Sequence, residues 1–173
     1  MIFHRTAIAG ALRVQLEPHA DARGSFARAF CTRELAAQGV SMIIAQANLA
    51  HTLKAGVIRG LHYQQAPLEQ KLVRCVGGAV FDVLVDLRPI SPSYRQVHCM
   101  RLDAAACEAI FIPGGVAHGY QSLVDDCEVL YLTDQYFVPG LDQGVRYDDP
   151  ALAIRWPLPA HEVNQRDREW PLL

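Results

Sequence analysis

A short apolar run, Gly56–Gln64, carries two residues that a buried strand normally excludes, Arg59 and His62. Buried strands use aliphatic side chains at their inward positions, because an unpaired cation or imidazole is costly to bury. We therefore expect both side chains to point into a cavity. Lys71, on a neighbouring predicted strand, and His118, after a Pro-Gly-Gly turn, would join them there. Several polar groups converging in the mouth of a β-barrel are the usual form of a small-ligand site.

Strand geometry sets a condition on this cavity. Side chains alternate between the two faces of a strand, so Arg59 and His62 would face opposite ways. One extra residue in the strand would restore a shared face, and an isolated glycine is where such a β-bulge is expected. We therefore predict a bulge at Gly60.

Two carboxylates, Asp82 and Asp86, share one face of the run Phe81–Leu87. The other face of this run is an unbroken apolar set, which is typical of a strand with one buried side. We expect a solvated or cavity-rim face for the two aspartates.

A transition-metal site has little support in the sequence. Barrels that hold such a metal usually offer a His-x-His pair, a nearby glutamate and a later histidine. After His62 the chain continues Tyr-Gln-Gln, and Glu69 follows only after a loop that contains proline. The chain also lacks the nucleophile elbow, the P-loop and the dinucleotide-binding glycine motif. We predict no metal ligands and no cofactor.

Hydrophobic periodicity predicts an all-β fold, a sandwich or barrel of short strands with few helices. One early helix is expected at Thr32–Gln38, with Thr32 as its cap and Gly39 at its end. The pair Gly77-Gly78 predicts a two-residue hairpin turn, and the tail from Asp148 is expected to pack across the barrel with short helical turns. The predicted strands are Leu12–Leu16, Ser25–Phe30, Ile43–Leu49, Val57–Tyr63, Gln70–Val76, Ala79–Leu87, Tyr94–Leu102, Ala109–Ile112, Ala117–Leu123 and Glu128–Thr133.

Length and composition limit the class of protein. The 173 residues, 51% of them hydrophobic and 20% charged, fit one globular domain over 1–173. A net charge of −2 gives no reason to expect nucleic acid or a membrane surface as a partner. No apolar run is long enough for a membrane span, and the N-terminus lacks the order of a signal peptide. Five scattered cysteines without a Cys-x-x-Cys pair favour reduced thiols and a cytoplasmic location.

The chain resembles the dTDP-4-dehydrorhamnose 3,5-epimerase family of nucleotide-sugar epimerases, which are metal-free cupins. The resemblance covers nearly the whole chain in order, and it implies a cupin-type jelly-roll β-barrel or sandwich with a few short helices. The matching segments are Asp21-Ala22-Arg23-Gly24-Ser25-Phe26, Gln46-Ala47-Asn48, the block Gly56–Gln64, Lys71-Leu72-Val73-Arg74, the block Val80–Arg88, Ser91-Pro92, Ile112-Pro113, Ala117-His118-Gly119-Tyr120, Asp148-Asp149-Pro150 and Trp156-Pro157.

The resemblance implies a reaction and a role for four residues. Protons beside the ketone of a 4-keto-6-deoxy sugar are acidic, so inversion at C3 or C5 needs a base on one face and an acid on the other. His62 matches the base, since the pKa of an imidazole lies near working pH, and Asp167 matches the carboxylate that orients it. Lys71 would stabilise the oxyanion at O4, and Tyr131 matches the proton donor.

The remaining matches imply substrate contacts. Arg23, Arg59 and Arg166 would meet the pyrophosphate or nucleotide, because a planar guanidinium suits bidentate contacts. Family members are typically homodimers with an exchanged N-terminal strand, so some of these contacts would come from a partner chain. The other expected contact residues are Gln46, Asn48, His118, Tyr136 and Asp142.

Some positions depart from the family pattern. Arg28 stands where many members carry glutamate, Leu49-Ala50 replaces His-Ser, and the loop before Gly56 is one residue longer. Asp142 and Arg166 replace a glutamate and a lysine. The catalytic set is retained while the substrate rim changes, which fits an epimerase of a related sugar or one acting at only one carbon. The alternatives are a nonenzymatic nucleotide-sugar-binding cupin, a sugar ketoisomerase and a metal oxygenase.

Overall fold

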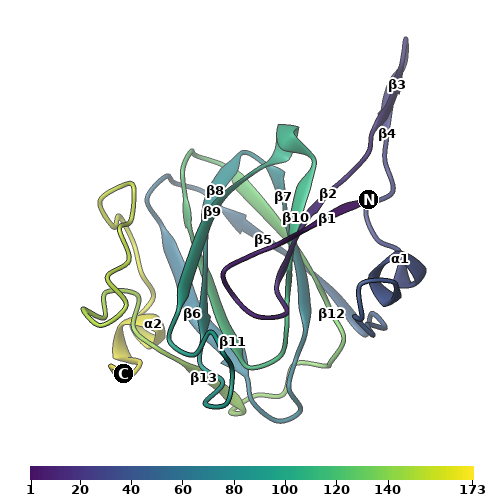
Figure 1. The fold of residues 1–173 in the computed structure, drawn as a ribbon. Coiled ribbons are helices and arrows are strands. Elements are labelled where there is room, and N and C mark those ends of the chain that lie inside the picture. The colour runs from purple at the N-terminus through teal and green to yellow at the C-terminus, as the bar shows by residue number, and fades with distance from the viewer.

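Two facing antiparallel sheets dominate the computed structural model, which describes residues 1–173 (Figure 1). The six-stranded sheet has the order β1 (Ile2–Arg5), β2 (Leu12–Gln15), β10 (Glu108–Ile112), β7 (Lys71–Gly77), β12 (Cys127–Thr133) and β5 (Gln46–Thr52). The five-stranded sheet has the order β13 (Asp142–Gly144), β6 (Ile58–Gln64), β11 (Val116–Ser122), β8 (Ala79–Asp86) and β9 (Val97–Asp103).

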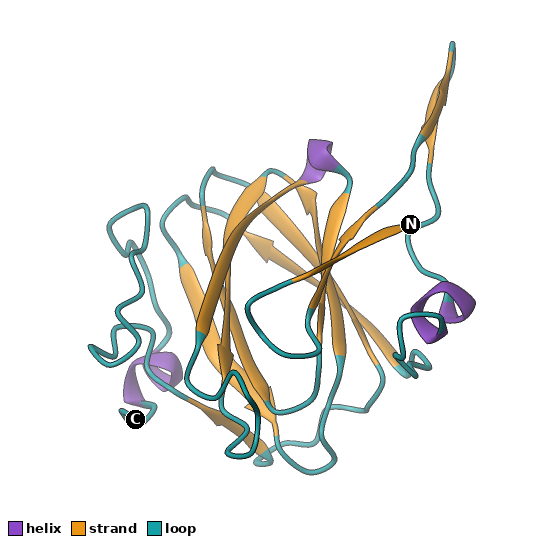
Figure 2. Cartoon of the chain, viewed as in Figure 1, coloured by secondary structure: helices purple, strands orange, loops and turns teal.

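Helix is confined to short pieces outside the sheets (Figure 2). These are α1 (Thr32–Ala36), the 3-10 turn η1 (Ala104–Ala106) and α2 (Gln165–Glu169). The all-β prediction with a few short helices is therefore confirmed. In α1 the N-cap position belongs to Cys31, which makes no side-chain cap bond, so the expectation of Thr32 as the cap was wrong.

Consecutive strands mostly cross from one sheet to the other, which is the pattern of a jelly roll. The turn at Gly77-Gly78 joins β7 to β8, and these strands lie in different sheets, so the predicted hairpin was wrong. Gly78 instead lets the chain turn between the sheets, with φ at +72° and a Cβ that would lie 2.9 Å from the Val124 side chain. The local signal located a tight turn, while the sheet that the next strand joins is decided by tertiary packing.

The main core fills the space between the sheets. Alternation along β7 and β12 turns Val73, Cys75 and Val129 inward, where they pack against Leu84 of β8 in the opposite sheet. All four side chains are almost completely buried. Burial of this kind contributes about 25 cal/mol for each Å² of apolar surface removed from water.

Smaller clusters cover the outer faces of both sheets. Val14, Leu72 and Phe111 on the six-stranded sheet pack beneath the segment that includes α1. Val83 and Leu152 belong to the cluster on the outer face of the five-stranded sheet, which the C-terminal tail covers as expected.

Because the tail covers that outer face, β8 is buried on both sides. Asp82 and Asp86 point between the sheets and are 0% exposed, so the expectation of a solvated face was wrong. Asp86 accepts hydrogen bonds from Arg88, Ser91 and Ser93, and these bonds hold the loop after β8.

A hairpin of β3 (His19–Asp21) and β4 (Gly24–Phe26) extends away from the sandwich on the N-terminal side (Figure 1). The predicted strand Ser25–Phe30 is thus mostly loop. The predicted strands Ile43–Leu49 and Tyr94–Leu102 begin three residues later in the structure, as β5 and β9. No helix has the length and apolar character needed to cross a membrane.

Candidate active site

A cavity of about 490 Å³ opens between the sheets at the end where β5, β6, β7 and β12 meet α2. It gathers nine of the residues singled out from the sequence, and three of them lie elsewhere. Those in the lining are Gln46, Asn48, Arg59, His62, Lys71, Tyr131, Asp142, Arg166 and Asp167.

The predicted bulge brings Arg59 and His62 to the same cavity. His62 pairs with His118 on β11 and Arg59 with Tyr120, so the three-residue step on β6 faces a two-residue step on its neighbour. Gly60 lies within the bulge with φ at +113°, and a Cβ there would lie 2.6 Å from the Gly119 backbone. The bulge therefore requires glycine.

Asp167 is held against this bulge. Its Oδ2 accepts a hydrogen bond of 2.8 Å from the Gly60 backbone N–H, and its carboxyl group is almost fully buried. Asn164 caps α2 by accepting a 2.7 Å bond from the Asp167 backbone N–H. The helix start thus fixes the carboxylate in the cavity wall, where its negative charge acts on His62.

Burial sets the protonation state of His62. Loss of water lowers the pKa of the imidazole to about 4, and this exceeds the opposing effect of Asp167, which raises it. The positive charges of Lys71 and Arg166 lower the pKa of His62 further, and so does the neighbouring His118. His62 is therefore neutral near pH 7, the state in which an imidazole can accept a proton.

Tyr131 faces this imidazole from the opposite sheet, because β12 and β6 lie on the two sides of the cavity. Burial raises the pKa of its phenol well above the usual value, and the nearby Tyr120 and Asp82 raise it further. Tyr131 is therefore protonated near neutral pH. A neutral base and a protonated acid thus come from opposing sheets.

Lys71 supplies a largely buried cation to the cavity wall. Its Nζ donates to Glu69 Oε2 at 2.5 Å, and both side chains are 12% exposed. An ammonium group has three N–H donors, so this ion pair leaves donors free for an oxygen in the cavity. The sequence had drawn attention to Glu69 only as a rejected metal ligand.

Hydrogen bonds within the chain already use part of the bonding capacity of Arg59 and Gln46. The Arg59 guanidinium donates to Thr52 Oγ1 at 3.2 Å and to the His51 carbonyl at 3.1 Å, which orients it at the cavity edge. Gln46 Oε1 accepts the backbone N–H of Phe137 at 2.5 Å, so its amide N–H groups are left for other partners.

Tyr136 lies outside the cavity, contrary to the expected substrate contact. The Gln64 side chain holds the loop on either side of Phe137, donating to the Tyr136 carbonyl and accepting from the Val138 N–H. This leaves Phe137 in the lining, while Tyr136 is 69% exposed.

His118 is also absent from the cavity lining. It is 2% exposed and shares a 2.7 Å hydrogen bond with Asp82 Oδ2. Its ring packs edge-on against Tyr131 with centroids 5.9 Å apart. It therefore packs beside Tyr131 without lining the cavity, and its expected contact with substrate stays a prediction.

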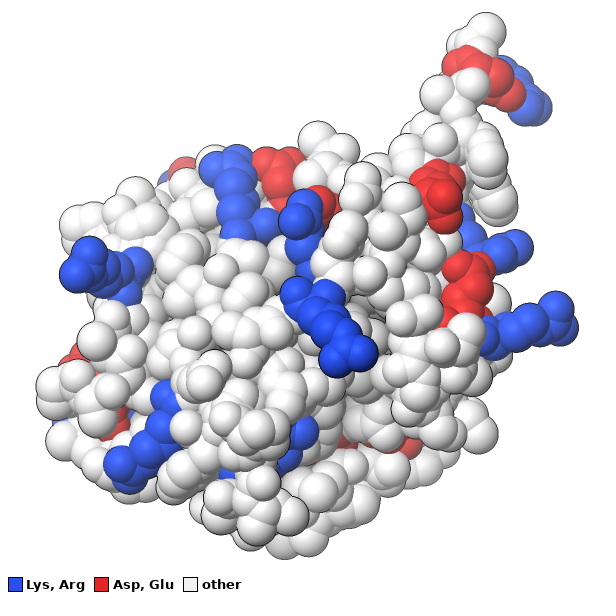
Figure 3. Space-filling model, in the orientation of Figure 1, with Lys and Arg blue, Asp and Glu red and all other residues white.

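Arg23 is far from the cavity of its own chain. It is at the tip of the β3–β4 hairpin, paired with Asp21 at 2.6 Å, and its side chain is 90% exposed. Figure 3 shows basic and acidic side chains at the tip of this hairpin and interspersed over the same face of the sandwich.

Asp142 and Arg166 form an ion pair at the cavity edge. The Arg166 guanidinium also stacks over Trp170 at 5.1 Å from the ring centroid. Trp170 in turn packs so closely on Gly144 of β13 that a Cβ there would lie 2.4 Å from the indole. These contacts bind the C-terminal segment to β13.

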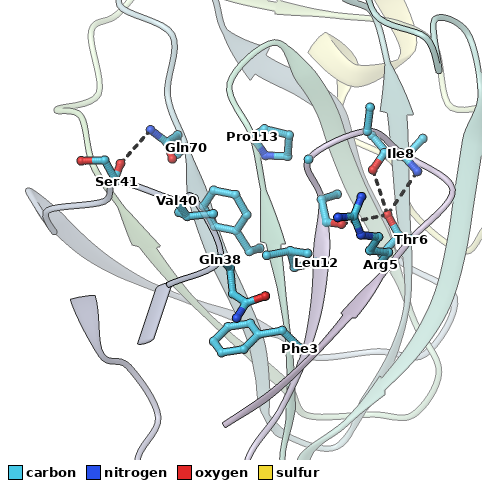
Figure 4. Close-up of a pocket in the computed structure, with 15 residues that line it drawn as sticks. Phe3, Arg5, Thr6, Ile8, Leu12, Gln38, Val40, Ser41, Gln70 and Pro113 are labelled. Carbon is cyan, nitrogen blue, oxygen red and sulfur yellow. Dashed lines mark hydrogen bonds between the residues drawn. The ribbon is translucent and has the colours of Figure 1, made fainter. Parts of the chain in front are cut away.

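A second cavity, of about 510 Å³, lies beside the β1–β2 hairpin and the segment after α1 (Figure 4). Arg5 is the one titratable residue in its lining. Two of its polar side chains are engaged locally, since Thr6 bonds to Ile8 and Gln70 donates to the Ser41 carbonyl. This cavity offers no acid–base pair, and nowhere do three His, Cys, Asp or Glu side chains gather as a metal ion would require.

A family model described as dTDP-4-dehydrorhamnose 3,5-epimerase matches residues 5–173. The chain belongs to this family. The membership makes it an isomerase, a sugar epimerase with the cupin-like jelly roll of that family.

Named relatives include epimerases of two kinds. The dTDP-4-dehydrorhamnose 3,5-epimerase of Methanothermobacter thermautotrophicus is 36% identical over 97% of this chain and 92% of its own length. A dTDP-4-dehydrorhamnose 3-epimerase of Streptomyces niveus is 38% identical over 96% of this chain and 81% of its own. The solved 3,5-epimerase of Bacillus anthracis, with TDP and pyrophosphate bound, is 35% identical, with a TM-score of 0.95 over 99% of both chains.

The cavity of this epimerase also contains residues that sequence reasoning missed. Thr133 follows Tyr131 on the same face of β12, so alternation could have placed it there. Asn164 could have been recognised as a helix cap three residues before Asp167. Phe137 had no such signal, because its position depends on the side chains of Gln46 and Gln64.

Proposed function

We propose that the chain inverts C3, C5 or both carbons of a 4-keto-6-deoxy sugar carried on a nucleoside diphosphate, with dTDP as the nucleotide that its relatives suggest. The observation that carries this proposal is the pair of opposed groups in one cavity, neutral His62 on β6 and protonated Tyr131 on β12. Inversion at a carbon beside a ketone needs this pairing, because the proton leaves one face and a new one arrives on the other.

In the proposed reaction His62 removes the proton from carbon, and the electron pair moves to the ketone oxygen as an enolate. Lys71 donates a hydrogen bond to that oxygen and stabilises its charge. Asp167 stabilises the imidazolium that forms. Tyr131 then gives its proton to the opposite face of the carbon, and water restores both groups between turnovers.

The substrate's diphosphate is assigned to cations at the cavity edge. Arg59 is oriented there by Thr52 and His51, and Arg166 lines the same cavity, paired with Asp142. Gln46 and Asn48 of β5 line the same wall and supply amide groups for the sugar or phosphate. Guanidinium and amide donors match phosphate oxygens.

We further propose a homodimer in which the β3–β4 hairpin of one protomer reaches the site of the other. The hairpin extends away from its own chain, and Arg23 at its tip has only Asp21 as a partner. A single domain over 1–173 and a cytoplasmic location stay predictions.

Deuterium exchange tests the reaction. The protein is incubated in deuterated water with dTDP-4-keto-6-deoxyglucose, and NMR locates deuterium at C3, C5 or both. The same assay with other nucleoside diphosphates defines the base. Exchange that is lost in His62→Ala, with dTDP binding kept, is the expected result. A protein that binds dTDP but exchanges no proton of any 4-keto nucleotide sugar would be a binding cupin instead.

A further inference from the structure

A carboxylate, Glu69, lies next to the lysine in the cavity wall. It belongs to the loop between β6 and β7 and lines the cavity described above. Its Oε2 accepts a hydrogen bond from Lys71 Nζ at 2.5 Å, and both side chains are 12% exposed. The other oxygen, Oε1, has no hydrogen-bond partner in the chain and stays accessible. One half of a largely buried carboxylate is therefore free to bind a ligand.

Contacts with β12 and the residue after it hold this carboxylate in place. The backbone N–H of Gln70 donates to Asp134 Oδ1 at 2.7 Å, and Lys71 pairs in register with Thr133. These contacts fix the two residues that directly follow Glu69. Its carboxylate therefore belongs to the fixed wall of the cavity and not to a free loop.

The other two carboxylates in the lining have partners of their own. Asp142 pairs with Arg166, and Asp167 accepts a hydrogen bond from the Gly60 N–H at the bulge. Glu69 is therefore the carboxylate next to the ammonium group that would receive the ketone oxygen of the substrate.

The charge of Glu69 has a cost in the proposed reaction. Lys71 is to stabilise the enolate oxygen, and a negative charge beside the ammonium group offsets part of that attraction. A substrate in the cavity also displaces water from Oε1, and a carboxylate oxygen without a donor is costly to bury. A hydroxyl group of the substrate would supply the missing donor.

The chemistry of a 4-keto-6-deoxy sugar identifies this hydroxyl. C4 carries the ketone that Lys71 would bind. Of its two neighbours, C3 carries a hydroxyl, whereas C5 carries the ring oxygen and the methyl group, neither of which can donate. The C3 hydroxyl is therefore the donor nearest to the oxygen that Lys71 binds.

We propose that Glu69 is a specificity-determining residue, with Oε1 accepting a hydrogen bond from the C3 hydroxyl while Oε2 holds Lys71. The inference rests on the proposed function. It places the C3 side of the sugar ring at the loop between β6 and β7. It also makes the epimerase selective for 4-keto sugars that have a hydroxyl beside the ketone.

Glu69→Gln tests this together with a substrate that lacks the C3 hydroxyl, dTDP-4-keto-3,6-dideoxyglucose. A carboxamide has one acceptor oxygen, so it cannot accept from both Lys71 and the sugar. With dTDP-4-keto-6-deoxyglucose we expect kcat/KM for deuterium exchange to fall roughly 10- to 100-fold, as for a lost hydrogen bond to a charged group. With the 3-deoxy sugar, Glu69→Gln and the wild type should differ by less than about threefold.

Glu108→Gln is the matched control. Glu108 has the same 12% side-chain exposure and pairs with Arg13 outside the cavity, so its variant should keep the wild-type kcat/KM with both sugars. The wild type alone gives a second measurement, with dTDP-4-keto-2,6-dideoxyglucose as the 2-deoxy sugar. Exchange of the 3-deoxy sugar should be slower than that of the 2-deoxy sugar by roughly tenfold or more.

The outcomes separate this inference from the proposed function. No exchange by the wild type with any 4-keto nucleotide sugar would remove the proposed function and the inference with it. Normal wild-type exchange, with equal losses for both sugars in Glu69→Gln, would overturn the hydroxyl contact alone, because an effect through Lys71 acts on the ketone that both sugars share. No loss with either sugar, or equal wild-type rates for the 3-deoxy and 2-deoxy sugars, would likewise overturn it.

Discussion

The Asp167 carboxylate accepts a hydrogen bond of 2.8 Å from the backbone N–H of Gly60, at the bulge that turns Arg59 and His62 toward one cavity. Asp167 therefore both acts on the His62 imidazole through its charge and holds the Gly60 backbone that directs His62 into the cavity. This gives Asp167 two separable contributions, one from its charge and one from its hydrogen bond.

Asp167→Asn isolates the charge. The carboxamide oxygen can still accept from Gly60, whereas the negative charge that raises the pKa of His62 is lost. The pKa of His62 should fall, which makes it a weaker base, and kcat should drop roughly 10- to 100-fold. The acid limb of the pH–rate profile should move to lower pH. Asp148→Asn, which alters an exposed carboxylate paired with Arg146, is the control, and an acid limb shared by both variants would contradict the role of Asp167.

Gly60→Ala tests the bulge. The new Cβ would lie 2.6 Å from both the Gly119 Cα and the His118 carbonyl oxygen, and φ at +113° strains any other residue. We expect unfolding free energy to fall by about 3 kcal/mol or more, from strain and overpacking together. Gly39→Ala is matched in its positive φ but meets no atom within 4 Å, and should cost about 1 kcal/mol. Equal urea midpoints for the two variants would argue against the crowded bulge.

The bulge could be predicted because it depends on the geometry of a single strand. Alternation puts Arg59 and His62 on opposite faces, so a shared cavity required an extra residue, and Gly60 was the residue that could form the bulge. Alternation could also have placed Thr133 beside Tyr131 on one face of their strand. Both inferences follow from the period of two, which needs no knowledge of the neighbouring strands.

The errors arose where a distant segment decides the outcome. Gly77-Gly78 marked a turn, but the next strand enters the other sheet. Asp82 was expected at a solvated face because the sequence does not show that the tail covers the opposite side of β8. Tyr136 was expected at the substrate, but Phe137 lines the cavity in its place, because the Gln64 side chain binds the loop on either side of Phe137. Each depends on a contact between segments far apart in the chain.

Asp86→Asn should destabilise the fold without touching the cavity. The buried carboxylate accepts hydrogen bonds from the Arg88 guanidinium and from the hydroxyls of Ser91 and Ser93. An amide cannot accept all of them and leaves the guanidinium without its counterion, so we expect a loss of about 3 kcal/mol. Asp103→Asn, at a more exposed ion pair with Arg101, should shift the urea midpoint far less than Asp86→Asn, because solvent screens an exposed pair.

Acid should destabilise the protein partly through His62. Its pKa is about 4 in the folded protein and near 6.5 when unfolded, so the unfolded state binds more protons between these values. The contribution of neutral His62 to the free energy of unfolding is therefore fully present above about pH 6.5, and it is lost as the pH falls toward 4. Between pH 7 and pH 4 the free energy of unfolding should therefore fall by roughly 2–3 kcal/mol less in His62→Asn than in the wild type. Urea midpoints for both proteins at the two pH values check this, and parallel losses would show that His62 does not titrate in this window.

Arg166→Gln should shift the pH–rate profile in the opposite direction to Asp167→Asn. The Arg166 guanidinium lowers the pKa of His62 through its charge, so its removal should raise that pKa and move the acid limb of kcat/KM to higher pH. The substitution also frees Asp142, whose negative charge is no longer paired at the cavity edge. Arg166→Lys keeps the charge and loses the stacking on Trp170, so its acid limb should stay near that of the wild type. The pH–rate profiles of Asp167→Asn, Arg166→Gln and Arg166→Lys are measured with the same substrate. Equal shifts in Arg166→Lys and Arg166→Gln would show that packing on Trp170, and not charge, causes the effect.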